Sequence, residues 1–287
     1  MMKTDQLAYF REAARWQHLT RASNALNISV SSISHAIRSL EAELGCKLFE
    51  KRGKNIFLTQ QGRLLSLKID QLFDHMEKIK NEVQSDEVAY SGRYRIGASP
   101  GLDQTYLLPR WSRFQKKYPD LIWQYSSHRS STIVDLVSKG ELDFGICFDP
   151  IESPLINSQT LKTLPHRISI RKGHPLNKKK NLTFKDILTY PCCSPKMYPG
   201  IETCKQHEIL AQKKVAPKVD FIFESYITAA HRISHTNSWC FLPEIFADHF
   251  GFKQFQFSGF DTKVQLKLIW PASHTLPRPI AMFFEDN

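Results

Sequence analysis

The sequence lacks the features that mark a membrane protein or a secreted, disulfide-bonded one. No window of the 287 residues approaches the run of about 20 apolar residues that a membrane-spanning helix needs, so we expect no membrane partner. No apolar run follows Lys3 near the start, so we expect no secretory leader and a cytoplasmic location. Cysteine is scarce, with six residues scattered along the chain, which argues against a disulfide scaffold.

The chain is basic, with a formal net charge of +11. Residues 1–90 hold 13 Lys and Arg against 11 Asp and Glu, and residues 91–287 hold 26 against 17. The local net charges are therefore +2 and +9. A basic chain suggests a polyanionic partner such as nucleic acid, but this distribution does not locate the binding site.

The first 58 residues predict three short helices followed by a small hairpin. The helices are expected over about 5–17, from a cap at Thr20 to Asn27, and over about 29–44, where Gly45 ends the third. Apolar residues at helical spacing form the expected core: Leu7, Phe10, Ala13, Ala14, Ala22, Ala25, Leu26, Ile33, Ile37, Leu40 and Leu44. Residues 48–50 and 56–58 predict two strands around a turn at 52–55.

Residues 59–87 predict one long helix with a narrow apolar stripe. The stripe follows alternating spacings of three and four, which is a heptad seam: Leu65, Ile69, Leu72, Met76, Ile79 and Val83. A stripe of this kind favours pairing with a second chain, and the alternative is packing on the helix's own domain. We therefore expect the six residues to form a dimer interface.

Beyond Arg93, short apolar runs alternate with helical segments. Strands are expected at 94–97, 122–125, 143–148, 168–170, 219–223, 239–241 and 264–270, with helices near 104–117, 130–139, 183–189 and 225–235. This alternation predicts parallel sheets in two small α/β lobes. Ligands of such folds bind in the crevice at the carboxyl ends of strands.

The start of the chain resembles the DNA-binding domain of LysR-type transcriptional regulators. The resemblance is carried by Leu7-x2-Phe10-x3-Ala14, Ala22-x2-Ala25-Leu26-x-Ile28-Ser29, Ser34-x2-Ile37-x2-Leu40-Glu41-x2-Leu44-Gly45-x2-Leu48-Phe49 and Leu58-Thr59-x2-Gly62. It continues through Leu107-Leu108-Pro109, Tyr118-Pro119, Gly140-Glu141-Leu142-Asp143, His174-Pro175-Leu176 and Leu242-Pro243, so it covers nearly the whole chain.

The resemblance implies an α/β protein in three parts. These are an N-terminal winged helix-turn-helix (1–58), a linker or dimerisation helix (59–90) and a C-terminal two-lobed effector domain (91–287) built like periplasmic binding proteins. Lobe I would comprise about 91–161 and 266–287, and lobe II about 162–265. The implied partners are double-stranded DNA with a palindromic operator, a small-molecule effector, and further copies in a homodimer or homotetramer. We expect no cofactor and no enzymatic activity.

DNA contacts are expected from the start of the third helix and from the hairpin. In a winged helix-turn-helix, the N-terminal residues of the recognition helix enter the major groove, while hydroxyl and basic groups hold phosphates. The candidates are Ser29, Val30, Ser31, Ser32, Ser34, His35 and Arg38, together with Lys51, Arg52 and Lys54 in the wing. Val30 stands where family members usually carry Gln. A Gln can bond an adenine edge, whereas a Val can only contact a thymine methyl group, so we do not expect the family's usual operator preference here.

A small anionic effector is expected between the lobes. Family effectors contact the loop after the first strand and the turn before the second helix of lobe I. Arg129 stands there where relatives often have a small residue, and a guanidinium at a helix start would grip a carboxylate or phosphate. The alternative is that Arg129 faces solvent or pairs with a nearby Asp. The candidate residues are Ser99, Pro100, Gly101, Arg129, Ser130, Ser131, Phe148, Ser194, Tyr198 and Tyr226.

A second departure from the family pattern lies before Leu242-Pro243. The stretch 235–240 occupies a place where relatives usually have glycine, so the backbone of lobe II near the cleft is expected to differ.

Two other functions fit parts of the sequence less well. Gly97-x-Ser99-x-Gly101 fits a hydrolase elbow, but the next residue, Pro100, has no N–H for an oxyanion hole. A solute-binding protein is opposed by the N-terminal domain and the missing leader.

Cysteine chemistry leaves one more alternative open. Cys192, Cys193 and Cys204 fall where peroxide-sensing relatives carry a redox pair, so a thiol redox sensor remains an alternative. Two candidate ligand pairs, His231 with His235 and Cys204 with His207, lack third and fourth ligands, so no metal site is expected.

Overall fold

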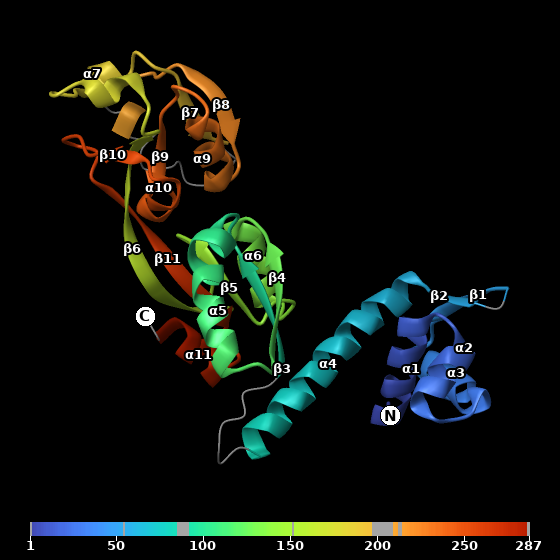
Figure 1. The fold of residues 1–287 in the computed structure, drawn as a ribbon. Coiled ribbons are helices and arrows are strands. Elements are labelled where there is room, and N and C mark those ends of the chain that lie inside the picture. Colours follow the sequence, from blue (N-terminus) through green and yellow to red (C-terminus); the bar gives the residue numbers. More distant parts are fainter. Residues whose placement is uncertain are drawn as a thin grey trace. The chain divides into compact units, whose positions relative to one another are not determined.

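The computed structural model describes residues 2–53, 55–84, 92–150, 152–196, 209–211 and 214–285 (Figure 1). The chain divides into two compact units, Met1–Gly92 and Arg93–Asn287.

The first unit holds three short helices, a hairpin and a long helix. They are α1 (Thr4–Trp16), α2 (Leu19–Leu26), α3 (Val30–Leu44), β1 (Phe49–Arg52), β2 (Asn55–Leu58) and α4 (Gln60–Gln84). Gln17, Asn27 and Gly45 adopt the left-handed conformation and end the first three helices. The predicted roles of Asn27 and Gly45 are therefore confirmed.

The helices of the first unit pack around two adjoining apolar clusters. One joins α1, α3, β1 and α4 through Leu7, Phe10, Leu40 and Ile69. The other joins α1, α2, α3 and β2 through Ala13, Ala22, Ile33, Ile37 and Ile56. All of these side chains are buried, so the helices fix the position of α3 in this unit.

Three local expectations for this unit were wrong. The second helix begins one residue before Thr20, with His18 at its N-cap, because the backbone already turns helical at Leu19. Ser23 is buried and Ala25 is exposed, the reverse of what we expected. Ser23 can be buried because its hydroxyl donates a hydrogen bond to the Thr20 carbonyl. Leu44 is 39% exposed because it lies in the last turn of α3, past the packed part of the helix.

The hairpin and the long helix are joined by a close backbone contact. The Thr59 hydroxyl donates a hydrogen bond to the Lys47 carbonyl. The Thr59 hydroxyl oxygen also accepts a hydrogen bond from the Gly62 amide. A Cβ at Gly62 would overlap the Leu48 carbonyl oxygen. This explains in physical terms why a glycine follows Thr59 at this spacing.

The second unit alternates strands and helices. Its strands are β3 (Gly92–Ala98), β4 (Leu121–Ser127), β5 (Phe144–Phe148), β6 (Ile156–Ile170), β7 (Cys192–Pro195), β8 (Val219–Phe223), β9 (Cys240–Pro243), β10 (Lys253–Phe255) and β11 (Thr262–Pro271). Its helices are α5 (Leu108–Lys117), α6 (Ser130–Ser138), α7 (Phe184–Ile187), α9 (Tyr226–Ser234), α10 (Glu244–Phe250) and α11 (Arg278–Glu285). A π-helical turn lies at Asp103–Leu107 and a 3-10 turn at Pro175–Lys178.

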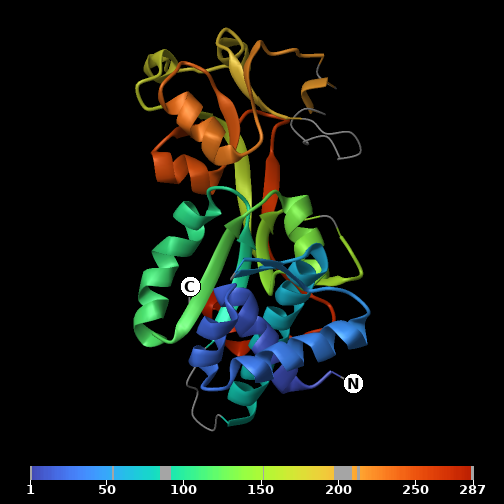
Figure 2. The same ribbon diagram turned by 90° about the vertical axis from the view of Figure 1, so that its right-hand side faces the viewer.

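Two long antiparallel strands, β6 and β11, run through both lobes of this unit (Figures 1 and 2). The main sheet has the order β10-β6-β11-β5-β3-β4, with β9 also paired to β6. The register of the two long strands shifts between Leu266 and Lys267, next to residue 266, where the chain is predicted to return to lobe I. The two-lobed α/β fold is confirmed, but the main sheet is mixed: β3 and β5 are parallel, whereas β11 is antiparallel to both β5 and β6.

Lobe I has a different core on each face of its sheet. On one face, aromatic side chains of α5, β4 and α11 pack together: the Trp123 and Phe283 centroids lie 4.3 Å apart, and the Trp111 ring lies 4.2 Å from Trp123, tilted by 39°. On the other face, Ile133 and Val137 of α6 pack on Cys147 and Ile269. No helix in the described part of the chain is long and apolar enough to cross a bilayer.

Candidate nucleic-acid interface and effector site

The N-terminal end of α3 presents a cluster of hydroxyl groups. Ser29 caps the helix, and its side-chain oxygen accepts from the Ser32 amide at 3.0 Å. The hydroxyls of Ser31 and Ser32 lie 2.7 and 2.8 Å from the same oxygen. The first-turn amides and these hydroxyls together favour a phosphate or a base edge.

Most of the remaining predicted DNA-contacting side chains lie exposed around this end. His35 and Arg38 are exposed, Ser34 is half-buried, and Val30 is 39% exposed. The Arg38 guanidinium bonds the Ser34 carbonyl at 3.2 Å, which holds it along the helix. Ser29, Ser31 and Ser32 thus lie together at the N-terminal end of α3, and Ser34, His35 and Arg38 follow within its next two turns.

The wing is a tight hairpin that carries basic residues. Lys51 is exposed on β1, and Gly53 has a φ of +64°, the left-handed conformation that the turn requires. Arg52 closes the strand opposite Asn55, but its side chain is outside the described part of the structure. Lys54 also lies outside the described residues.

Sequence reasoning assigned no role to Glu41, which fixes the hairpin to α3. The Glu41 carboxylate accepts from the Leu48 amide at 2.9 Å and from Lys47 Nζ at 2.8 Å. Burial alone would raise the pKa of Glu41, but the bonds from Lys47, Leu48 and Phe49 outweigh it and lower the pKa. The sequence signal that could have identified Glu41 is its place directly after Leu40 in the motif that carries the family resemblance.

The predicted dimer seam on α4 divides into two parts. Ile69 is only 2% exposed and packs with Leu7 and Phe10, and Leu65 is half-buried against the same cluster. Ile69 therefore belongs to the core of its own unit, and its assignment to the dimer interface was wrong. Leu72, Met76 and Ile79 are 41%, 43% and 47% exposed. The side chain of Val83 lies outside the described part.

In lobe I, hydrogen bonds join three of the predicted effector-binding segments. The Ser99 and Ser130 hydroxyl oxygens lie 3.4 Å apart, and the Ser130 hydroxyl donates to the Phe148 carbonyl at 3.1 Å. The loop after β3, the start of α6 and the end of β5 therefore meet. Within the described residues, no histidine or carboxylate bonds Ser99, so the elbow motif lacks the neighbours of a catalytic serine.

The same segments contact lobe II through apolar side chains. Gly101 has a φ of +89°, and a Cβ there would lie 2.7 Å from Ile227 and 2.8 Å from Phe246. The rings of Phe148 and Tyr226 meet edge-on with centroids 5.8 Å apart. Phe246 on α10, which sequence reasoning missed, packs on both rings.

The other predicted effector-binding residues are placed less closely together. Arg129 is the exposed N-cap residue of α6, and Ser131 is exposed in its first turn. Pro100 is half-buried beside Gly101, and Ser194 is half-buried at the end of β7. Tyr198 lies outside the described residues. The arrangement offers amide, hydroxyl and guanidinium groups at one helix start, which suits an anion.

A buried histidine stands beside this aromatic group. His166 on β6 is 1% exposed and packs edge-on against Tyr226, with centroids 5.4 Å apart. Burial lowers its pKa to about 4, against the opposing effect of a bond to the Phe241 backbone. His166 is therefore neutral at pH 7.

The described cysteines do not favour redox sensing. Cys192 and Cys193 are buried, and burial raises the pKa of each to about 12, so both are protonated thiols at neutral pH. Cys204 and His207 lie outside the described residues. Among the residues that the structure describes, no three metal-ligating side chains gather at one point.

Comparison with protein families identifies both units. Residues 4–63 match the model of the bacterial regulatory helix-turn-helix protein, lysR family, and residues 89–285 match the LysR substrate binding domain. The predicted family resemblance is therefore confirmed over most of the chain.

Individual relatives agree with this assignment. The uncharacterized HTH-type transcriptional regulator YybE of Bacillus subtilis is 25% identical over 85% of this chain and 83% of its own length. The regulator SsuR of Burkholderia cenocepacia is 30% identical over 66% of this chain, but the match spans only 63% of SsuR. Full-length CbnR complexed with its target DNA has a TM-score of 0.65 at 16% identity, covering 99% of this chain and 98% of CbnR. The chain belongs to the LysR family of transcriptional regulators.

Proposed function

We propose that this protein binds a specific DNA operator through α3 and the wing, and that a small anion bound between its lobes controls it. The observation that carries the DNA part is the exposed end of α3, where Ser31, His35 and Arg38 face solvent while Ile33 and Ile37 anchor the helix. A buried anchor with an exposed polar side is the arrangement that a recognition helix needs. The DNA bound in the CbnR complex supports the same partner for this fold.

The operator is proposed to be a palindrome bound by a homodimer. Besides Leu72, Met76 and Ile79, α4 exposes Leu64 and Leu67 at 62% and 46%. So many exposed apolar side chains on one helix favour a partner chain that covers them. A twofold dimer reads two half-sites of opposite orientation, which gives a palindrome. Assembly into a homotetramer and a cytoplasmic location are part of the same proposal.

The effector is proposed to be a carboxylate or a phosphate ester. The start of α6 supplies backbone amides, the Ser130 and Ser131 hydroxyls, and the exposed Arg129. The backbone amides, the Ser131 hydroxyl and the Arg129 guanidinium can each donate a hydrogen bond to the ligand, whereas the Ser130 hydroxyl donates to the Phe148 carbonyl. The dipole of the helix also favours a negative charge there. The net charge of +9 on residues 91–287 assists the capture of an anion.

A genome-wide binding footprint of the full chain tests the DNA part. We expect one recurrent palindromic motif upstream of a limited set of genes, and we expect a Ser31→Ala, His35→Ala double variant to lose the enrichment. A variant at exposed Lys139 in the second unit should leave the footprint unchanged. Binding spread evenly over the genome would contradict the proposal.

A further inference from the structure

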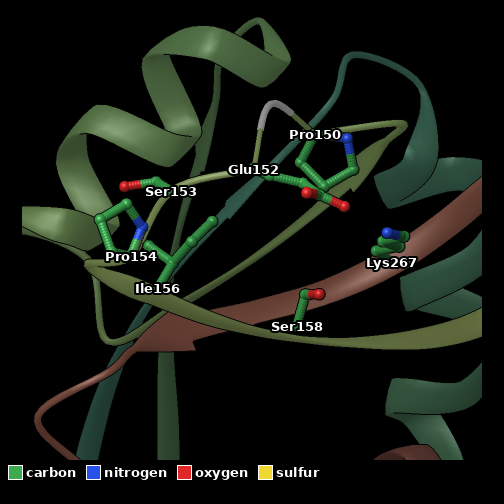
Figure 3. Close-up of a pocket in the computed structure, with 7 residues that line it drawn as sticks. All are labelled: Pro150, Glu152, Ser153, Pro154, Ile156, Ser158 and Lys267. Atoms are coloured by element: carbon green, nitrogen blue, oxygen red, sulfur yellow. The ribbon is translucent and has the colours of Figure 1, made fainter.

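A polar hollow of about 440 Å³ lies on lobe I, apart from the residues assigned above (Figure 3). Its lining is Pro150, Glu152, Ser153, Pro154, Ile156, Ser158 and Lys267. The volume falls within the range of about 300–1,000 Å³ that is usual for small-molecule sites. None of the predicted DNA-binding or effector-binding residues belongs to this lining.

The floor of the hollow is formed by the two long strands. Lys267 of β11 is opposite Thr160 of β6, and Ile269 is opposite Ser158. Residues that face each other across antiparallel strands point to the same side of the sheet, as do residues two apart on one strand. Ser158 therefore points to the same side as Ile269, and Lys267, two residues before Ile269, shares that face. Figure 3 shows both side chains rising from this floor.

Hydrogen bonds to β11 and to the residue that follows it hold the chain on either side of the wall residues. Asp149 adopts a φ of +38°, its carboxylate Oδ1 accepts from the Gln265 amide at 2.9 Å, and its own amide donates to the Gln265 carbonyl at 2.9 Å. At the other end, the Ala272 amide donates to the Leu155 carbonyl at 2.9 Å. Asp149 and Leu155, which flank the wall residues, are thus held in place, and this lowers the entropic cost of binding a ligand beside them.

Two opposite charges face this hollow without meeting. Lys267 is half-buried and Glu152 is exposed, and the Glu152 carboxylate extends toward Lys267 (Figure 3). Neither side chain forms a hydrogen bond or an ion pair with another residue in the described part of the chain. A half-buried ammonium group gains from a counter-charge, and the hollow leaves room for one carried by a ligand.

We propose that this hollow is a second small-molecule site, and that it binds an amino acid as a zwitterion. The carboxylate of the ligand would lie on Lys267 Nζ and its ammonium group on Glu152. The hydroxyl of Ser158 is available to the polar end, and Pro154 and Ile156 give the ligand's side chain an apolar surface. The two charges at opposite sides distinguish this ligand class from the simple anion proposed for the start of α6.

Calorimetric titration of the full chain with each standard L-α-amino acid tests the proposal. We expect saturable binding of at least one of them. Acetate and methylammonium, which keep only one of the two charges, should bind at least about tenfold more weakly because each loses one charge-assisted contact.

Variants distinguish this site from the one between the lobes. Lys267→Met and Glu152→Gln, each with an unchanged melting temperature, should weaken amino-acid binding about tenfold or more. Lys263→Met, on an exposed position of the same strand, and Arg129→Ala should leave it unchanged. The proposal is overturned if no amino acid binds, if both charge variants keep the wild-type affinity, or if Arg129→Ala alone removes binding.

Discussion

The ring of Phe148, at the end of β5, meets the ring of Tyr226, at the start of α9, edge-on at 5.8 Å between centroids. The Phe148 carbonyl also accepts from the Ser130 hydroxyl in the first turn of α6. A ligand held at the start of α6 would therefore act on a residue that touches lobe II. This is the physical route by which binding can bias the arrangement of the lobes.

The first prediction concerns the charge of the effector. In a thermal-unfolding screen of the full chain, carboxylates and phosphate esters should raise the melting temperature, because binding to the native state stabilises it. Arg129→Ala should remove most of this shift, whereas Lys139→Ala, at the other end of α6, should retain it. Stabilisation by neutral or cationic compounds alone, or an undiminished shift in Arg129→Ala, would refute the assignment.

The wing should contribute electrostatic affinity without sequence preference. Lys51→Ala should weaken binding to all DNA sequences and lower the slope of log K against log salt by about one unit, since one phosphate contact is lost. Lys68→Ala, an exposed cation on α4, serves as the control and should keep the slope. Anisotropy titrations over a range of salt concentrations measure both. A wild-type slope in Lys51→Ala would show that this lysine does not contact phosphate.

Substitutions on α4 should separate dimerisation from folding. Leu72→Glu with Met76→Glu places charge in an exposed apolar patch, so the variant should fold but sediment as a monomer. Ile69→Ala should instead lower the free energy of unfolding by about 2–4 kcal/mol, because Ile69 is buried in the core of its own unit. Analytical ultracentrifugation and denaturant unfolding test the pair. A dimeric Leu72/Met76 variant would place the interface elsewhere.

Burial of His166 predicts a pH dependence of stability. Its pKa is lowered to about 4 in the native state, so between about pH 6.5 and 4 the unfolded chain binds the extra proton. The native state should lose up to about 3 kcal/mol as the pH falls through this window. His166→Phe should lose less stability than the wild type over the same window, and His249→Phe, at an exposed position, should behave like the wild type. Equal losses in His166→Phe and the wild type would contradict the buried neutral state.

Much of this fold follows from local sequence, and the exceptions have physical reasons. Gly45 ends α3 as predicted because a helix stop depends on one residue's conformation. Only residues 168–170 of β6 were predicted as a strand, and residues 156–167 were missed because 157–160 are polar and exposed, without the alternation that marks a strand. Ile69 was assigned to the wrong surface because periodicity identifies an apolar stripe but not what covers it.

The sites show the same division between local and long-range information. The hydroxyl cluster of α3 comes from adjacent residues, so its position could be predicted. The contact of Phe148 with Tyr226 and the approach of Glu152 to Lys267 join residues far apart in the chain. Such pairs depend on how distant strands and helices pack against one another, which adjacent residues do not determine.

The central claim is that the exposed end of α3 reads a DNA sequence, and a competition measurement tests it most directly. The ratio of affinities for the operator from the footprint and for a scrambled duplex of equal length is measured for the wild type, Ser31→Ala and His35→Ala. We predict a large ratio for the wild type and a loss of about 1–3 kcal/mol of discrimination in a variant that removes a base contact, with little change on the scrambled duplex. An unchanged ratio in both variants would contradict the claim.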